Sequence, residues 1–130
     1  MRTILLFATL LIAGCAGNIS NPGAEYGFHF GGVGDADTGE YSYLYVTEVA
    51  CRGPATDKLY RRDVITRLTI NRETFDFTRI VPRRRVEEMS SRLAIARYEA
   101  EIWIREGGFL GPEKYYVLTP GNASWNPLFC

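Results

Sequence analysis

The fold of this 130-residue chain depends most on one stretch, Tyr41-Ser-Tyr-Leu-Tyr-Val-Thr-Glu-Val-Ala-Cys51. Its large side chains recur with a period of two, which is the spacing of side chains on one face of a β-strand. One predicted face holds Tyr41, Tyr43, Tyr45, Thr47, Val49 and Cys51. Leu44, Val46 and Ala50 fall on the other face, so the pattern predicts a long strand that is buried on both sides.

Shorter runs with the same period lie before and after this stretch. Residues 26–30 alternate aromatic side chains with glycine and histidine, and a second set alternates through Val64, Thr66, Leu68 and Ile70. The polar residues 71–74 then lead to Phe75 and Phe77, which is typical of a hairpin. A final strand is predicted over residues 114–119.

The segment 83–105 fits two patterns. A 3-4 helical spacing connects Val86, Met89, Leu93, Ala96, Ala100 and Trp103, whereas strict alternation fits residues 96–105. On a helix, the apolar residues of 96–105 would scatter around most of the circumference. We therefore expect a short helix or turn near 83–91, with Pro82 suited to its first turn, and a strand over 94–106.

These elements predict an all-β, mainly antiparallel fold. About six strands with at most one short helix would form a small β-sandwich or an open barrel. The predicted domain covers residues 26–130, a length that suits a single core.

The amino end has the pattern of a secretory signal. An apolar run from Ile4 to Ala13 follows the basic residue Arg2, and small residues end the run. This order is typical of a signal peptide. The alternative is a membrane-spanning helix, which needs roughly 20 apolar residues, about twice the length of this run. We therefore expect residues 1–14 to be a signal peptide.

The sequence Ile12-Ala-Gly-Cys15 resembles the lipobox of bacterial lipoproteins. The resemblance covers only the first fifteen residues. It implies that Cys15 carries a diacylglycerol thioether, that the chain is cut before Cys15, and that the new amino end is acylated. Ala16 stands where an aspartate often retains such proteins at the inner membrane of Gram-negative bacteria. In such a host, the resemblance implies a lipid anchor in the outer membrane and a domain that faces the periplasm.

Residues 15–25 are then the lipidated end and a flexible tether. Gly, Asn, Ser and Pro dominate this segment, and such a composition buries little apolar surface. Cutting before Cys15 removes 14 of the 130 residues and leaves 116, with residues 26–130 as a single β domain.

If Cys15 carries lipid, Cys51 and Cys130 remain as an even pair of cysteines in an oxidising compartment. A bond between them would close a loop of about 80 residues and contribute on the order of 4 kcal/mol. We expect this disulfide; the alternative is two unpaired thiols. The cysteines have no Cys-x-x-Cys spacing, so the sequence supports neither redox catalysis nor a zinc site.

The charges balance overall but are unevenly distributed. The chain has 15 Lys and Arg and 15 Asp and Glu residues. Residues 15–51 contain five acidic and no Lys or Arg residues, whereas residues 52–92 contain eleven basic residues, among them the run Arg83-Arg84-Arg85. Arginine suits lipid head groups or an acidic partner. We favour pairing of acidic and basic strands within the fold, and we expect no nucleic-acid partner.

Few residues point to catalysis. His29 is the only histidine, and no Gly-x-Ser-x-Gly elbow accompanies it, so we expect a surface histidine. Glu99 and Glu101 share one strand face and could form an acid–base pair. Because Arg97 and Arg105 flank them, a ladder of surface charges is the interpretation we favour.

The acidic segment 34–40 could be read as a calcium loop. Asp35, Asp37 and Glu40 place oxygen ligands near a glycine, as calcium sites do. The spacing departs from the EF-hand, however, and Asp and Gly are also typical of hairpin turns. We favour the turn and expect no metal ion or other cofactor.

The sequence predicts a non-enzymatic, lipid-anchored accessory protein of the cell envelope. Its β domain would bind another envelope component, and the membrane contact would be the lipid on Cys15. Tyr41, Tyr43 and Tyr45 could form a protein or glycan contact, although we favour core packing for them. The alternative function is a periplasmic inhibitor or immunity lipoprotein, whose acidic loop 34–40 enters a lysozyme-like enzyme or a toxin.

Overall fold

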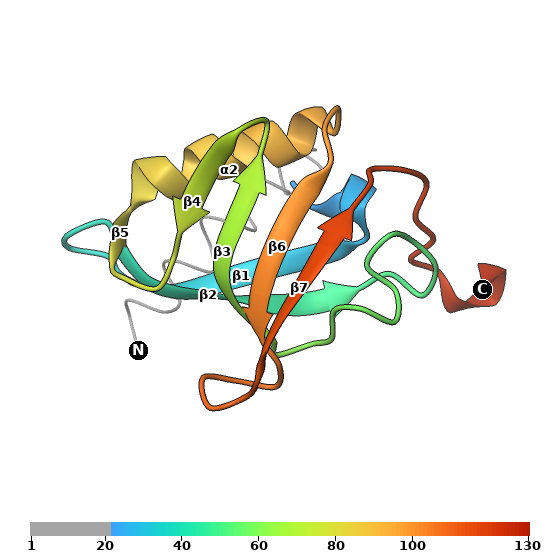
Figure 1. Ribbon diagram of the computed structural model, residues 1–130, viewed down its shortest axis with the longest axis horizontal. Coiled ribbons are helices and arrows are strands. Elements are labelled where there is room, and N and C mark those ends of the chain that lie inside the picture. The colour runs from blue at the N-terminus through green and yellow to red at the C-terminus, as the bar shows by residue number, and fades with distance from the viewer. Residues whose placement is uncertain (1–21) are drawn as a thin grey trace.

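The computed structural model describes residues 22–130, which form a seven-stranded sheet and one long α-helix (Figure 1). In chain order the elements are η1 (Ala24–Tyr26), β1 (Phe28–Asp35), β2 (Glu40–Val49), β3 (Val64–Ile70), β4 (Glu73–Asp76), β5 (Val81–Pro82), α2 (Arg83–Ile95), β6 (Ala100–Arg105), β7 (Glu113–Leu118) and η2 (Pro127–Phe129). The named strand pairs are antiparallel. The all-β prediction is confirmed, and the sheet is open.

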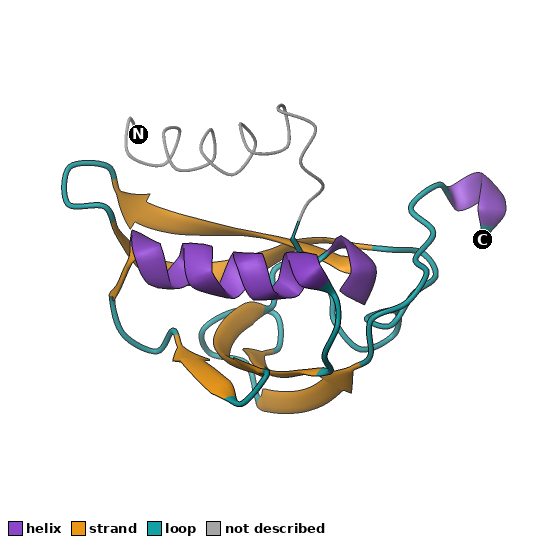
Figure 2. Cartoon of the chain, turned by 90° about the horizontal axis from the view of Figure 1, so that it is seen from above, coloured by secondary structure: helices purple, strands orange, loops and turns teal. Residues whose placement is uncertain are grey.

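The sheet has the strand order β1-β2-β3-β6-β7 and divides into two groups of strands. One group is β1 and β2, the other is β3, β6 and β7, and a short stretch of pairing between β2 and β3 joins them. β2 and β3 pair only through Leu44 with Ile65 and Tyr45 with Val64. β4 pairs with the other half of β3. As a result, β1 and β2 run across the direction of the remaining long strands (Figure 1), and α2 occupies the opening between the two groups (Figure 2).

Two bulges in β2 decide which of its side chains face the core. Opposite β1, the pairing skips Ser42 and Thr47, and each extra residue reverses the alternation. Tyr41 therefore turns inward and is 4 % exposed, whereas Tyr43 and Tyr45 turn outward and are half-buried. The prediction of one continuous Tyr41–Cys51 face, buried on both sides, was wrong because it assumed an unbroken period of two.

The core lies between the inner face of the sheet and α2. It contains the buried residues Tyr26, Phe28, Phe30, Tyr41, Leu44, Val46, Ala55, Leu59, Ile65, Leu68, Ile70, Phe75, Phe77, Val86, Met89, Leu93, Ala100, Ile102, Ile104 and Leu118. Burial raises the pKa of Tyr26 to about 12, although its hydroxyl donates a hydrogen bond to the carbonyl of Tyr98.

The helix is longer than predicted. It continues to Ile95 and ends because Ala96 adopts the left-handed conformation, with φ 55° and its N–H bonded to the carbonyl of Leu93. The predicted strand over 94–106 therefore begins only at Ala100. Val86, Met89 and Leu93 form the buried side of the helix, so packing against the sheet stabilises the helix.

Arginines of α2 pair within the fold. Arg85 and Arg92 form ion pairs of 2.7 and 2.5 Å with Glu73 of β4, and the Arg85 guanidinium lies 4.2 Å from the ring centre of Phe75. The hydrogen bond from Arg85 is the main cause that lowers the pKa of Glu73. These contacts join the exposed side of the helix to the end of the sheet.

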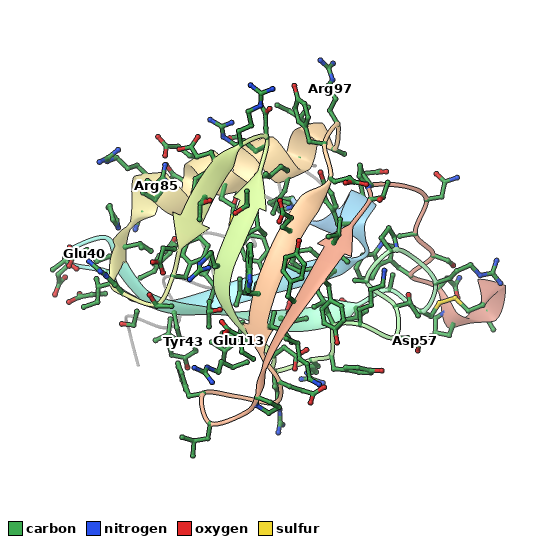
Figure 3. All side chains as sticks on the ribbon, in the orientation of Figure 1. Glu40, Tyr43, Asp57, Arg85, Arg97 and Glu113 are labelled. Atoms are coloured by element: carbon green, nitrogen blue, oxygen red, sulfur yellow. A yellow bond between two sulfur atoms is a disulfide. The ribbon has the colours of Figure 1, made fainter. Side chains whose placement is uncertain are left out.

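The carboxyl-terminal segment returns to the domain beside the end of β2. Arg52 and Ser124 exchange backbone hydrogen bonds of 3.3 and 2.7 Å. The structure joins Cys51 and Cys130 in a disulfide with their Cα atoms 6.1 Å apart (Figure 3). Cys51 is exposed and not on a buried face as predicted, and Leu128, near the end of the chain, is 86 % exposed.

The predicted signal peptide, Cys15 and tether residues 16–21 lie outside the described residues. Within residues 22–130, no helix has the length and apolar character needed to cross a membrane.

Replacement of Leu93 by alanine tests the packing of α2. Leu93 has no exposed surface, so Leu93→Ala should lower the free energy of unfolding by about 2–5 kcal/mol, measured by urea denaturation. Ser91→Ala is the matched control, because Ser91 is exposed on the same helix and should change stability by about 0.5 kcal/mol or less. Equal effects of the two substitutions would contradict the placement of α2.

The disulfide should stabilise the closed position of the tail. Cys130→Ser removes a link between residues separated by 79 positions, and we expect it to lower the free energy of unfolding by about 2–5 kcal/mol. Thermal denaturation should show the same loss for Cys51→Ser and for the reduced wild-type protein. Two free thiols in protein isolated without reductant would refute this pairing.

Candidate functional site

The outer face of the sheet, opposite α2, carries a group of aromatic side chains. Tyr43 and Tyr45 come from β2, Trp103 from β6, Tyr115 from β7 and Phe109 from the β6–β7 loop; we call this group the aromatic face. Cross-strand pairing places Trp103 beside Tyr115, with ring centres 4.8 Å apart. Phe109 is 58 % and Tyr115 47 % exposed, so the surface is open to solvent.

The rings of β2 extend this surface to the β6–β7 loop. The ring centres of Tyr43 and Tyr45 are 6.0 Å apart, and Phe109 meets Tyr43 edge-on at 4.6 Å. In Figure 3, Tyr43 and Glu113 lie at the loop end of the sheet and Arg97 lies at the opposite end. Edge-on aromatic contacts fix ring orientation, so Phe109 has a defined position over β2.

A hollow of about 430 Å³ opens beside this contact. It is lined by Val33, Tyr43, Tyr45, Arg62, Val64, Gly107, Gly108 and Phe109. Aromatic and aliphatic walls with one arginine suit an apolar side chain from a partner whose polar atoms can meet the guanidinium.

Charged side chains contact Trp103 and Tyr115 of the aromatic face. The Arg67 guanidinium lies 5.1 Å from the ring centre of Trp103. The Tyr115 hydroxyl donates a 2.7 Å hydrogen bond to Glu101, and this bond is the main cause that raises the pKa of Tyr115. Glu99 accepts a bond of 3.2 Å from Thr119. Both glutamates thus accept hydrogen bonds from hydroxyl groups on β7 or just after it. The charge pattern of the sequence did not indicate these partners.

His29 lies on β1 near the docked tail. Its Nδ1 is 3.3 Å from a carboxylate oxygen of Glu48, and its ring stacks on Trp125 with ring centres 4.0 Å apart. Burial lowers the pKa of His29, and the charge of Glu48 opposes this effect only in part. The neutral imidazole therefore helps to dock Trp125, so His29 has a structural contact here.

The acidic segment 34–40 forms the β1–β2 hairpin turn. Asp35 Oδ1 accepts a 2.9 Å bond from the N–H of Asp37, and Gly39 has a φ of +73°. Asp35, Asp37 and Glu40 are exposed. In the part of the chain that the structure describes, no three His, Cys, Asp or Glu side chains are placed to hold a metal ion.

Sequence reasoning missed most of the aromatic face. Trp103, Phe109 and Tyr115 were not identified as candidate site residues, and Tyr43 and Tyr45 were assigned to the core. One available signal was the segment Gly107-Gly-Phe-Leu-Gly-Pro112, in which two large apolar residues stand inside a glycine- and proline-rich turn. Turns rarely need such residues for their own stability, so this pair marks a surface of interest.

No protein-family model matches this chain, and no similar curated protein or similar solved structure was found. Its functional interpretation therefore depends on the chemistry of its own residues.

The docking of Trp125 on His29 should make stability depend on pH. Since the pKa of His29 is below its ordinary value of 6.5, the folded chain holds fewer protons than the unfolded chain below that pH. Stability should therefore fall as the pH decreases from about 7 to about 5. In thermal denaturation followed by circular dichroism, His29→Gln should reduce this fall.

Glu48→Gln is the matched control for this prediction. It removes the charge that raises the pKa of His29, so the fall in melting temperature should become larger. An unchanged pH dependence in His29→Gln would show that the folded and unfolded chains bind protons equally at this residue.

Proposed function

We propose that this chain is a lipid-anchored, non-enzymatic accessory protein of the cell envelope that binds another envelope component. Its anchor would be the lipid on Cys15, in the outer membrane of a Gram-negative host, with the β domain in the periplasm. The aromatic face would be the binding surface.

One observation carries this proposal: large aromatic side chains lie open on the outer face of a sheet whose inner face already fills the core. Tyr115, Val117 and Phe109 are 47, 39 and 58 % exposed. Aromatic residues are enriched at the centres of protein interfaces, where they bury large areas with few rotatable bonds. Exposed aromatic surface of this kind suits a contact with another macromolecule.

The alternative proposal is an inhibitor or immunity protein. It is favoured by the exposed carboxylates of Asp35 and Asp37 at the β1–β2 turn, which projects from one end of the sheet (Figure 2). Inhibition of a lysozyme-like enzyme that disappears in an Asp35→Asn/Asp37→Asn variant would favour this function over the accessory role.

The accessory role is tested with full-length protein in intact envelopes. Chemical cross-linking and mass spectrometry should identify a membrane-associated partner of the wild-type chain. Tyr115→Ser should lower recovery of that partner about tenfold or more, because truncation of a central aromatic residue removes a large part of the binding energy. Tyr98→Ser is the matched control: Tyr98 is 41 % exposed and lies at the opposite end of β6.

Cys15→Ser tests the anchor separately. This variant should leave the membrane fraction or accumulate as an uncut precursor. Unchanged membrane fractionation would contradict the lipid anchor, whereas equal partner recovery from Tyr115→Ser and the wild type would contradict the role of the aromatic face.

A further inference from the structure

The β6–β7 loop, residues 106–112, is held in one conformation by its own hydrogen bonds. The N–H of Glu106 donates to the carbonyl of Pro112 at 2.9 Å, and the N–H of Gly111 donates to Gly108 at 3.1 Å. The Arg105 side chain donates to the carbonyl of Gly111 at 3.2 Å. These bonds close the loop from both sides, so its tip has a fixed shape.

Glycine is required at three positions of this loop. Gly107 has a φ of +77° and Gly108 a φ of +143°, which side-chain-bearing residues rarely adopt. At Gly111, a Cβ atom would lie 1.7 Å from the carbonyl oxygen of Glu106. The sequence therefore specifies this loop conformation closely.

A buried carboxylate ties the loop to the rest of the domain. Asp63, in the β2–β3 connection, is 1 % exposed. One of its oxygens accepts a 2.9 Å bond from the N–H of Gly107, and the other accepts a 2.8 Å bond from the N–H of Tyr60. Burial of a carboxylate is unfavourable unless hydrogen bonds compensate it. Here one bond comes from the base of the β6–β7 loop and the other from the β2–β3 connection itself.

The tip that is held in this way is apolar and open. Leu110 is fully exposed, and Phe109 is 58 % exposed while its ring rests on Tyr43. A single exposed leucine on a protein surface needs no explanation. The exposed Phe109–Leu110 pair is a different case, because three glycines and a buried carboxylate hold its loop in one conformation. This conformation does not bury Leu110.

The tip lies at the far end of the domain from the point where the chain enters it. Next to η1, Tyr26 donates to the carbonyl of Tyr98 before β6, and the N–H of Gly121 after β7 donates to Glu25 at 2.9 Å. The loop joins the other ends of β6 and β7, each six residues long, which places it about 20 Å away. The tip is therefore the end of the β6–β7 hairpin that lies farther from η1.

We propose that the β6–β7 loop inserts Leu110 and Phe109 into an apolar pocket of a partner protein in the cell envelope. The 430 Å³ hollow beside Phe109 receives a side chain of that partner in return. Exposed charges of both signs, on Arg62, Arg105, Glu106 and Glu113, lie beside the hollow and at the base of the loop, and they form the polar rim of the contact. Mixed rim charges suit a protein better than an anionic lipid surface, which would require mainly basic neighbours.

This inference rests on the proposed function, and the experiment separates the two. A photo-reactive amino acid is placed at position 110 of the full-length chain in intact envelopes, and at position 128 as a control, since Leu128 is 86 % exposed at η2. We expect one envelope protein to cross-link from position 110 and not from position 128. The cross-linked protein is then purified for binding measurements with the lipidated chain in detergent.

Leu110→Asp should weaken that binding about 30-fold or more, as expected for a central apolar anchor. Leu128→Asp should change it less than about twofold, and both variants should keep the circular dichroism spectrum of the wild type. Cross-links from position 110 to lipid alone, or only to a second copy of this chain, would overturn the proposal.

Loss of the partner in Tyr115→Ser but not in Leu110→Asp would overturn this inference and leave the aromatic face as the binding surface. Retention of the partner in both variants would overturn the proposed function as well.

Discussion

A single helix covers the inside of a strongly curved sheet, and the other features of the domain depend on this packing. β2 and β3 share only two residue pairs, so their pairing alone leaves the two strand groups weakly joined. Val86, Met89 and Leu93 of α2 fill the space between these groups and are fully or almost fully buried. Because both groups contact one helix, the hydrophobic effect holds them at their crossing where ladder hydrogen bonds are few.

The bulges of β2 and β3 allow one sheet to line the core on its inner face and to carry aromatic side chains on its outer face. Each skipped residue reverses the direction of the side chains that follow and increases the local twist. In β2, the bulge at Ser42 places Tyr41 in the core and Tyr43 outside; in β3, the pairing with β6 skips Thr66 and leaves Arg67 exposed above Trp103. The core thus closes around α2 while aromatic residues remain on the outside.

The sequence predicted the fold class and most strands, but not the way in which side chains divide between the two faces. Alternation locates Leu44 and Val46, or Leu68 and Ile70, because local period and burial agree there. It fails at Tyr41, where an inserted residue that carries no composition signal changes the phase. The end of α2 was misplaced for a related reason: helix and strand patterns overlap over residues 96–103, and only contact with the sheet decides between them.

The candidate site was harder to predict because its residues are far apart in the sequence and come together only in the folded domain. Asp63 and Gly107 are 44 positions apart, and neither pattern nor composition indicates that the carboxylate of one holds the backbone of the other. Stability alone does not explain this arrangement. Glycine loses more backbone conformational entropy on folding than other residues do, Asp63 loses solvation, and Leu110 buries no surface in return. In the proposed contact, a fixed apolar tip would favour association, because no free energy would be needed to order the loop on binding. Under the same proposal, the aromatic face would offer a similar advantage, because the ring contacts that order it are already made within the folded domain.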